Sequence, residues 1–410
     1  MNELDAAVRA AVRAAAPYAT AVTVAVVHGD REEVRCHGRL ARTADAPTCT
    51  PDTVFELGSV SKTFTALLLA EMTATGELAP ADPVEDRLPP DWLPVTVRST
   101  DPIRLLHLAT HTSGLPRLPP GLLAGAVRNW AGNPYTAFGD EQLRVALART
   151  TVRCTPGSRY RYSNYGVGLL GRVLAETGGL PYGELLTRRV CRPLGLPATT
   201  CAPDPANLAT GYRHGRAVPP WSIPGLPGAG AVRSTGADLL RYLRAHLDAP
   251  RPGSSCRGSG GGGGGGALGA ALADVQRARL RLPHSTDELC LVWNRRRSGG
   301  RDLYFHTGGT RGFTTFVGFS PETAAAVAVL ANTGPILDGR FVQAGYEVLR
   351  TVARTTTTGR SHRPTPAATV ATAIAATTAT TATTARGRPP ERTDRHTSAP
   401  DGRRCVEDGP

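Results

Sequence analysis

The sequence predicts an α/β (α+β) fold in which one antiparallel sheet, built from both chain ends and flanked by helices, carries a mostly helical insert. Near the N-terminus, the β-branched run 22–27 and residues 33–37 outline a hairpin. Near the C-terminus, four further segments have the composition of strands. Between these ends, from about residue 60 to about residue 250, helical patterns alternate with loops. The two sets of strands therefore belong to one sheet, and the middle of the chain is inserted between them.

The N-terminal elements follow from simple patterns. Residues 5–16 are rich in alanine and are predicted to form a helix that ends at Pro17. The turn of the hairpin is the sequence His28-Gly29-Asp30. From about residue 60, apolar side chains recur at helical spacing, and Gly76 ends this second helix.

The C-terminal elements are mostly strands. Residues 338–353 have the pattern of a closing helix. The strand-like segments before this helix are 289–293, 303–305, 313–319 and 325–330.

The domain prediction has one large body and a tail. The body covers residues 1–353, with an α/β part at about 1–75 and 286–353 and a helical part at about 76–285. Residues 253–266 form a flexible Gly-rich insertion within the helical part, because no Lys-Ser or Lys-Thr follows the glycines as a phosphate loop would require. Residues 354–410 consist mainly of Thr, Ala, Arg and Pro and are expected to be disordered.

The charge of the chain does not by itself indicate a nucleic-acid partner. The 410 residues carry a formal net charge of +13 at pH 7. Binding to nucleic acid would require basic residues concentrated on one element or in a known module. The arginines are scattered instead, and only 5% of the residues are aromatic. We therefore expect a small-molecule substrate and no nucleic acid, while the oligomeric state stays open.

Two segments bear on membranes and secretion. Residues 367–385 are uncharged and long enough to cross a bilayer, but they are nearly all Ala and Thr and too polar for insertion. The start, Met1 to Asp5, is acidic where a signal peptide would be basic. As written, the chain is expected to stay in the cytoplasm without a membrane span, whereas a start further upstream would make it a secreted protein.

No pattern in the sequence indicates a metal or a cofactor. The eight cysteines are dispersed without a C-x-x-C pair, so free thiols are expected. His107 and His111 lie four residues apart, but Leu108 occupies the Glu position of an H-E-x-x-H motif and no third ligand follows. We expect neither a metal nor a cofactor.

The most informative segment contains a serine and a lysine three residues apart. Gly58 supplies a turn, Ser59 opens a helix, and Lys62 lies one turn further on the same face. A serine hydroxyl is a poor nucleophile until a neighbour takes its proton, and a desolvated lysine can do so.

Lysine usage strengthens this interpretation. One of the 47 basic residues is a lysine, Lys62, and the other 46 are arginines. Arginine cannot lose its proton near neutral pH, whereas a buried lysine can. The composition thus indicates that Lys62 is a residue that has to lose and regain its proton.

Two further motifs supply polar groups. In the loop Arg159-Tyr160-Arg161-Tyr162-Ser163-Asn164, Tyr162 and Asn164 can point to the same side, offering a phenol and an amide. In the segment 304–313, the strand residues are followed by glycines whose backbone N–H groups suit an oxyanion hole.

These motifs, in this order and separation, resemble the serine β-lactamase and penicillin-binding protein superfamily, specifically its class C-like branch. The resemblance rests on Ser-x-x-Lys, Tyr-x-Asn and His-Thr-Gly, and it extends over about residues 5–350. Two supporting segments, 105–116 and 228–240, are also similar to that branch. The resemblance implies a β-lactamase-like fold, in agreement with the strand pattern.

The resemblance also implies catalytic roles. Ser59 would be the nucleophile, Lys62 its base partner and Tyr162 a proton relay. Because the protons of Lys62 and Tyr162 are coupled, which of them is the acylation base stays open. The backbone N–H groups of Ser59 and Gly309 would form the oxyanion hole.

The same resemblance assigns residues to substrate binding. Asn164 would anchor both the substrate and Lys62. The third motif would contribute His306, Thr307, Gly308 and Gly309.

The function implied is a serine hydrolase that cleaves an ester, amide or β-lactam bond through an acyl-serine intermediate. His306 stands where secreted β-lactamases of this branch usually carry Lys, which favours neutral esters over substrates with a carboxylate. The alternatives are a D-alanyl-D-alanine carboxypeptidase, a true β-lactamase, or a non-catalytic binding or assembly protein on the same fold. The absence of G-x-S-x-G from the sequence argues against an α/β-hydrolase.

Overall fold

The computed structural model describes residues 3–92, 96–98, 100–122, 133–250, 266–282, 285–335 and 338–354. The predicted Gly-rich insertion, apart from Gly266, and the predicted tail, apart from Arg354, lie outside these residues.

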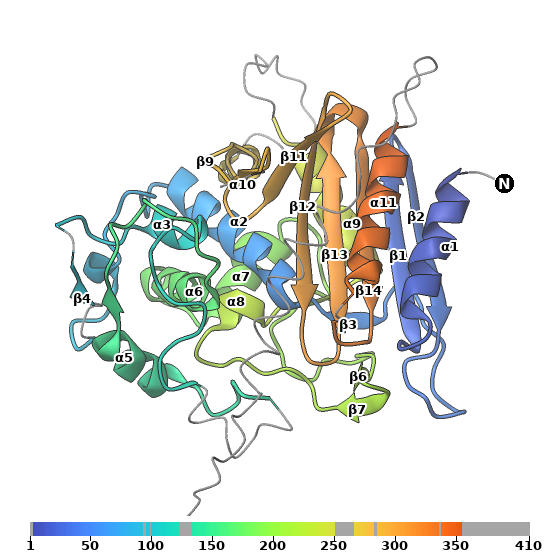
Figure 1. Cartoon of the computed structure of the whole chain (residues 1–410), viewed down its shortest axis with the longest axis horizontal. Helices are drawn as coiled ribbons and strands as arrows, with labels where there is room; N and C mark the ends of the chain where they lie inside the picture. The colour runs from blue at the N-terminus through green and yellow to red at the C-terminus, as the bar shows by residue number, and fades with distance from the viewer. Residues whose placement is uncertain are drawn as a thin grey trace, which may run out of the picture.

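An eight-stranded antiparallel sheet forms one side of the molecule (Figure 1). The order of its strands is β2-β1-β14-β13-β12-β11-β10-β9. The N-terminal β1 pairs with the C-terminal β14, with Val24 opposite Val329, so the prediction of one sheet from both chain ends is confirmed. The strands are β1 Ala21–His28, β2 Arg31–Gly38, β9 Leu280–Arg281, β10 Glu288–Leu289, β11 Asn294–Ser298, β12 Arg301–Gly309, β13 Thr314–Ser320 and β14 Ala325–Ala331.

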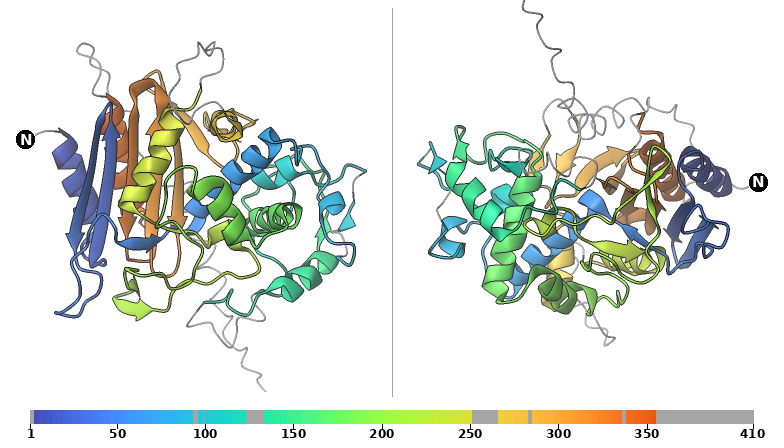
Figure 2. Two further views of the ribbon diagram at one scale, coloured as in Figure 1. Left: turned by 180° about the vertical axis from the view of Figure 1, so that it is seen from behind. Right: turned by 90° about the horizontal axis from the view of Figure 1, so that it is seen from below.

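Helices cover both faces of the sheet. On one face α1 (Glu3–Ala15) packs beside α11 (Arg340–Arg354), and on the other face lies α9 (Gly236–Leu247), seen from behind in Figure 2. The domain prediction placed residues 236–247 in the helical part, yet α9 packs on β1, β13 and β14. Its leucines recur at helical spacing and are buried, and this apolar stripe faces the sheet.

The chain between the sheet strands forms helices and short strand pairs. β3 pairs with β8 and β6 with β7, both antiparallel, while β4 and β5 are parallel. The short strands are β3 Val54–Glu56, β4 Thr96–Val97, β5 Thr151–Val152, β6 Gly211–Arg213, β7 Arg216–Val218 and β8 Arg233–Thr235. The helices are α2 Ser61–Ala74, α3 Leu105–Ala109, α5 Asp140–Arg149, α6 Asn164–Gly178, α7 Tyr182–Leu186, α8 Pro227–Gly230 and α10 Ala267–Asp274. The short 3₁₀ helices are η1 Gly58–Val60, η2 Glu85–Arg87 and η5 Pro321–Thr323, and η4 Thr187–Cys191 is a short π-helix.

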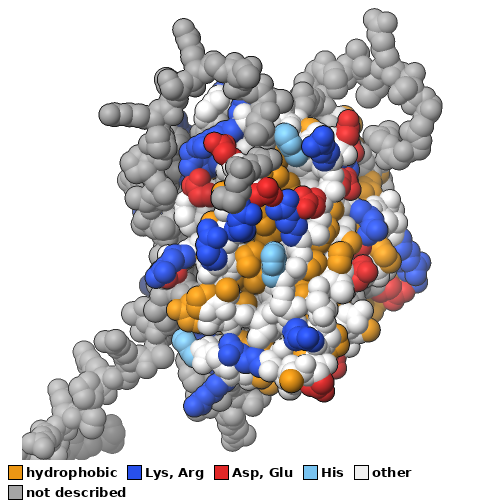
Figure 3. All heavy atoms as spheres, turned by 90° about the vertical axis from the view of Figure 1, so that its right-hand side faces the viewer, with side chains coloured by type: hydrophobic (Ala, Val, Ile, Leu, Met, Phe, Trp, Pro, Cys, Tyr) orange, Lys and Arg blue, Asp and Glu red, His pale blue; other side chains and the backbone are white. Residues whose placement is uncertain are grey.

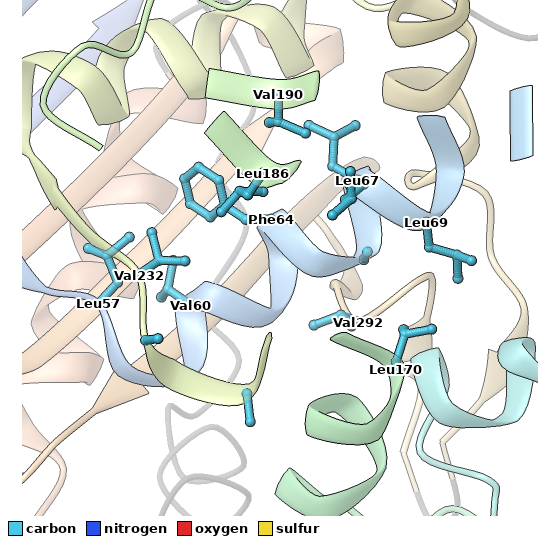
Figure 4. Packing of buried hydrophobic residues seen from close by; sticks show 14 of the residues in the cluster. Leu57, Val60, Phe64, Leu67, Leu69, Leu170, Leu186, Val190, Val232 and Val292 are labelled. Atoms are coloured by element: carbon cyan, nitrogen blue, oxygen red, sulfur yellow. The ribbon is translucent and has the colours of Figure 1, made fainter. Parts of the chain in front are cut away.

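Helix α2 is the central helix of the molecule. It is buried on all sides from Ser61 to Met72, and Figure 4 shows Phe64 and Leu67 of α2 among apolar side chains of neighbouring segments. A helix that is enclosed on every side forms part of the core of the molecule. This burial fixes the start of α2, where the predicted serine and lysine lie.

The predicted strand 289–293 is wrong for residues 290–293. β10 ends at Leu289, and a turn follows in which the Cys290 N–H donates to Trp293 O. Val292 has a positive φ of 68°, which no strand residue adopts. β11 follows immediately, and the sequence did not indicate it because it is polar (Asn-Arg-Arg-Arg-Ser). In the structure, Arg295 and Arg296 are paired with Asp302 and Asp287.

Charged side chains cover the edge of the sheet at β2. Arg35 pairs with Asp5 and Glu33, and Glu32 pairs with Arg244. On the face that Figure 3 shows, basic and acidic side chains lie close to one another. Charges at an edge strand prevent pairing with another chain. Among the residues that the structure describes, no helix combines the length and apolarity needed to cross a membrane.

Candidate active site

A tight turn presents Ser59 between the sheet and the central helix. The chain leaves β3, turns through η1 and enters α2, so Ser59 lies two residues before α2 begins. Gly58 has a φ of +52°, and a Cβ atom there would lie 2.6 Å from the backbone N of Gly309. Only glycine accommodates both the conformation and the close approach.

Lys62 and Tyr162 both reach the hydroxyl of Ser59. The Lys62 ammonium donates to Ser59 Oγ at 3.0 Å and to the carbonyl of Ala229 at 2.7 Å. The Tyr162 hydroxyl donates to the same Ser59 Oγ at 2.8 Å. Lys62 is completely buried, and this burial lowers its pKa from the ordinary value of 10.5. A lysine that loses its proton more easily can accept one from serine.

The ring of Tyr162 lies between two cations and a histidine. The Lys62 ammonium and the Arg117 guanidinium each lie 5.2 Å from the centre of the ring. The ring of His111 lies 4.5 Å from it. Cations near an aromatic face are attracted to it, so these contacts hold the phenol in place.

The start of α6 fixes the loop that carries Tyr162. Ser163 is the N-cap: its Oγ accepts the N–H of Gly166 at 2.8 Å and donates to the carbonyl of Pro116 at 2.6 Å. A capping serine satisfies a backbone donor at a helix start. The Asn164 N–H donates to the carbonyl of Arg117 at 2.9 Å.

The predicted contact between Asn164 and Lys62 is not present in the structure. In the described part of the chain, Lys62 donates to Ser59 and Ala229, and Asn164 is not among its hydrogen-bond partners. The Asn164 Oδ1 is buried without a partner among the described residues. This oxygen is therefore able to accept a hydrogen bond.

The C-terminal end of β12 lies directly against the serine turn. A Cβ atom on Gly308 would lie 2.0 Å from the carbonyl oxygen of Leu57 and 2.3 Å from Thr315 Oγ1. Thr315 Oγ1 donates to that same carbonyl at 2.9 Å. Gly309, the next residue, is exposed, and its backbone is the one that Gly58 approaches. The structure thus brings the predicted third motif to the predicted nucleophile.

His306 is a neutral side chain. It is buried, and its Nδ1 donates to the carbonyl of Thr307 at 2.8 Å, which leaves Nε2 as the acceptor. Burial, with a smaller effect of the charge on Lys62, lowers the pKa of His306 to about 3. At neutral pH this position therefore carries no positive charge. Thr307, the next residue of the motif, is half-buried.

Two further residues belong to the site although the sequence did not indicate them. The Nδ1 of His111, which lies in the supporting segment 105–116, accepts the Ser163 N–H at 3.2 Å, and the ring of His111 contacts Tyr162. Glu56 is buried three residues before Ser59. A carboxylate inside the apolar segment Val54-Phe55-Glu56-Leu57 was a signal available in the sequence. The contact of His111 with Tyr162 arises from tertiary packing, and no pattern in the sequence indicated it.

The structure describes no metal-binding cluster. In the described ranges, no group of three or more His, Cys, Asp or Glu side chains is arranged to hold a metal ion. The Nδ1 of His107 accepts the Arg104 N–H at 3.2 Å, so it takes part in a helix start.

The chain is similar to proteins of one known family. The family model described as Beta-lactamase matches residues 7–351. The D-alanyl-D-alanine-carboxypeptidase/endopeptidase AmpH of Escherichia coli (strain K12) is 28% identical over 323 residues, which are 78% of this chain and 80% of that protein.

Solved structures share the fold. A β-lactamase/D-alanine carboxypeptidase from Yersinia pestis has a TM-score of 0.68 at 22% identity, covering 85% of this chain and 96% of its own. A class C β-lactamase from Rhodobacter sphaeroides has a TM-score of 0.67 at 23% identity, covering 86% and 99%. The β-lactamase-like fold is therefore confirmed, and the chain belongs to the β-lactamase family.

Proposed function

We propose that this β-lactamase-family serine hydrolase forms an acyl-enzyme on Ser59 and acts mainly on neutral esters. The observation that carries the proposal is the convergence of Lys62 Nζ and Tyr162 OH on Ser59 Oγ, at 3.0 and 2.8 Å. A serine that contacts two proton-transfer groups is equipped for nucleophilic attack.

The proposed reaction has two halves. Ser59 Oγ attacks the substrate carbonyl while its proton passes to the coupled pair Lys62 and Tyr162. The backbone N–H groups of Ser59 and Gly309 receive the negative charge of the tetrahedral intermediate. The pair then returns a proton to the leaving group, and water releases the acyl group by the same steps.

Two polar groups suit the binding of a substrate beside this centre. The Asn164 Oδ1, buried without a partner among the described residues, can accept a hydrogen bond from a substrate N–H or O–H. Thr307 on β12 lies next to His306 and can contact the substrate from the strand.

The preference for neutral esters rests on His306. A fixed cation at this position would attract a substrate carboxylate, but burial keeps His306 neutral above a pKa of about 3. Compared with a site that carries a cation here, binding of esters without a carboxylate is unchanged. Binding of β-lactams and of peptides that end in D-Ala is weaker, because their carboxylate has no cation to pair with at this position.

A D-alanyl-D-alanine carboxypeptidase is the second candidate. It is favoured by the relative AmpH, whose name gives that activity. Arg311, two residues after Gly309, could supply the cation that His306 lacks.

Replacing His306 with Lys should shift the substrate preference. We expect wild-type protein to hydrolyse 4-nitrophenyl acetate faster than nitrocefin or a D-Ala-D-Ala peptide. His306→Lys should raise kcat/KM for nitrocefin relative to the ester by roughly tenfold, because a new cation attracts the carboxylate. His306→Gln is the neutral control and Ser59→Ala the blank. A wild-type preference for nitrocefin that does not respond to His306→Lys would contradict the ester assignment.

A further inference from the structure

A buried carboxylate joins the two backbone segments on either side of the predicted oxyanion hole. Glu56 is 3% exposed and lies three residues before Ser59. Its Oε2 accepts the hydroxyl of Thr310 at 2.7 Å, and Thr310 directly follows Gly309. One hydrogen bond therefore connects the strand that leads to the nucleophile with the strand that carries the other oxyanion donor.

The second oxygen of Glu56 contacts two further segments. Glu56 Oε1 accepts the backbone N–H of Trp221 and lies 3.6 Å from the guanidinium of Arg233, which is 2% exposed. Arg233 also donates to the carbonyls of Ala231 and Trp221. The segment 229–233 includes Ala229, whose carbonyl accepts from Lys62. The carboxylate of Glu56 thus joins Thr310 to the segments that contain Trp221 and Arg233.

Thr310 makes this connection rigid on the side of β12. Its Oγ1 donates to Glu56 and accepts the backbone N–H groups of Gly312 at 3.3 Å and Phe313 at 3.1 Å. The turn between β12 and β13 is therefore closed around the same hydroxyl. The hydrogen bond from Thr310 to Glu56 thus ties this turn to β3.

Stability alone does not account for such an arrangement. Burial raises the pKa of Glu56, which means that the ionised form is costly at this position. A buried ion pair can often be replaced by apolar side chains of similar volume without loss of stability. Hydrogen bonds to a carboxylate are, however, directional and fix the positions of the groups that donate them more closely than apolar contacts do.

We propose that Glu56 is a positioning residue that, through Thr310, holds Gly309 and the Ser59 turn at the separation required to bind an oxyanion. This inference rests on the proposed acyl-serine function. Glu56 itself contacts neither Ser59 Oγ nor the substrate in this assignment, and it acts on the backbone donors alone.

The test compares two variants of Thr310. Thr310→Ser keeps the hydroxyl, and Thr310→Val removes it at similar volume. With 4-nitrophenyl acetate, Thr310→Val should lower kcat roughly 10- to 100-fold with KM changed by less than about threefold, because only the transition state uses the oxyanion site. Phenylboronic acid, which forms a tetrahedral adduct with serine, should bind more weakly by a similar factor. Thr310→Ser should restore both values to within about threefold of wild type.

Glu56→Gln provides an independent variant that leaves Thr310 intact. Glu56→Gln should lower kcat and boronic acid affinity in the same proportion. The double variant Glu56→Gln/Thr310→Val should be no less active than the more impaired of the two single variants, because both changes break the same connection. If Thr310→Val does not fold, kcat and boronic acid affinity of Glu56→Gln and Thr310→Ser test the role of Glu56 instead.

Labelling of Ser59 by a fluorophosphonate separates the possible failures. A wild type that takes no label overturns the proposed function and this inference with it. A labelled wild type whose Glu56→Gln and Thr310→Val variants keep kcat and boronic acid affinity overturns only the inference. A fall in melting temperature with unchanged kcat per folded molecule also overturns it, because that is the result of a purely structural role.

Discussion

Lys62→Arg is expected to be nearly as damaging as Lys62→Ala, with kcat/KM for the preferred ester reduced roughly 10²- to 10⁴-fold by either change. Arginine keeps the positive charge but cannot give up its proton near neutral pH. Burial already lowers the pKa of Lys62, so the wild-type lysine can lose its proton where arginine cannot. The arginine is also larger than the enclosed position allows, which adds to the loss.

The pH profile separates proton transfer from size. In wild type, kcat/KM should rise as the pH rises through the lowered pKa of Lys62, because the neutral amine is the active form. The residual activity of Lys62→Arg should lack this rise. Measurement of kcat/KM between pH 5 and pH 10 for wild type, Lys62→Arg and Lys62→Ala checks this. An arginine variant that keeps most of its activity would show that Lys62 acts only through its charge.

Gly308→Ala should cost both stability and activity. A Cβ atom at this position would lie 2.0 Å from the Leu57 carbonyl oxygen, so β12 and the serine turn have to move apart. We expect the free energy of unfolding to fall by about 1–3 kcal/mol. Turnover should fall by roughly 10²-fold, because displacement of an oxyanion donor by a fraction of an ångström disrupts the transition-state geometry.

Gly266→Ala is the matched control for this substitution. A Cβ atom on Gly266 would meet no atom of the described residues within 4 Å, and the φ of Gly266 is negative. Its stability should remain within about 0.5 kcal/mol of wild type, with unchanged turnover. Chemical denaturation and ester kinetics measure both quantities. A Gly308→Ala protein as stable and active as the control would contradict the close packing of Leu57 against β12.

The sequence was sufficient to predict the large sheet because the strands at its centre are strongly apolar. The runs 22–27 and 325–330 are buried on both faces and pair with each other in the structure. The polar β11 was missed, since its arginines are satisfied by carboxylates that only the fold brings near. β3 and β8 have three residues each, too short for a recognisable period.

The candidate site was predictable where spacing along the chain determines geometry. Ser59 and Lys62 share one helical turn, and the structure places their side chains within hydrogen-bond distance. The expected contact between Asn164 and Lys62 is not found, because such a contact depends on how the loop before α6 packs against α2 and not on spacing along the chain. Glu56 and His111 act through residues more than 50 positions away, Thr310 and Tyr162 respectively, so local patterns could not reveal their role.

Intact mass spectrometry of the protein after reaction with a fluorophosphonate or a penicillin tests the central claim most directly. The geometry of Lys62 and Tyr162 around Ser59 predicts one covalent adduct per chain, located on Ser59 and abolished by Ser59→Ala. An adduct that persists in Ser59→Ala, or that maps to another residue, would contradict the assignment of Ser59 as the nucleophile.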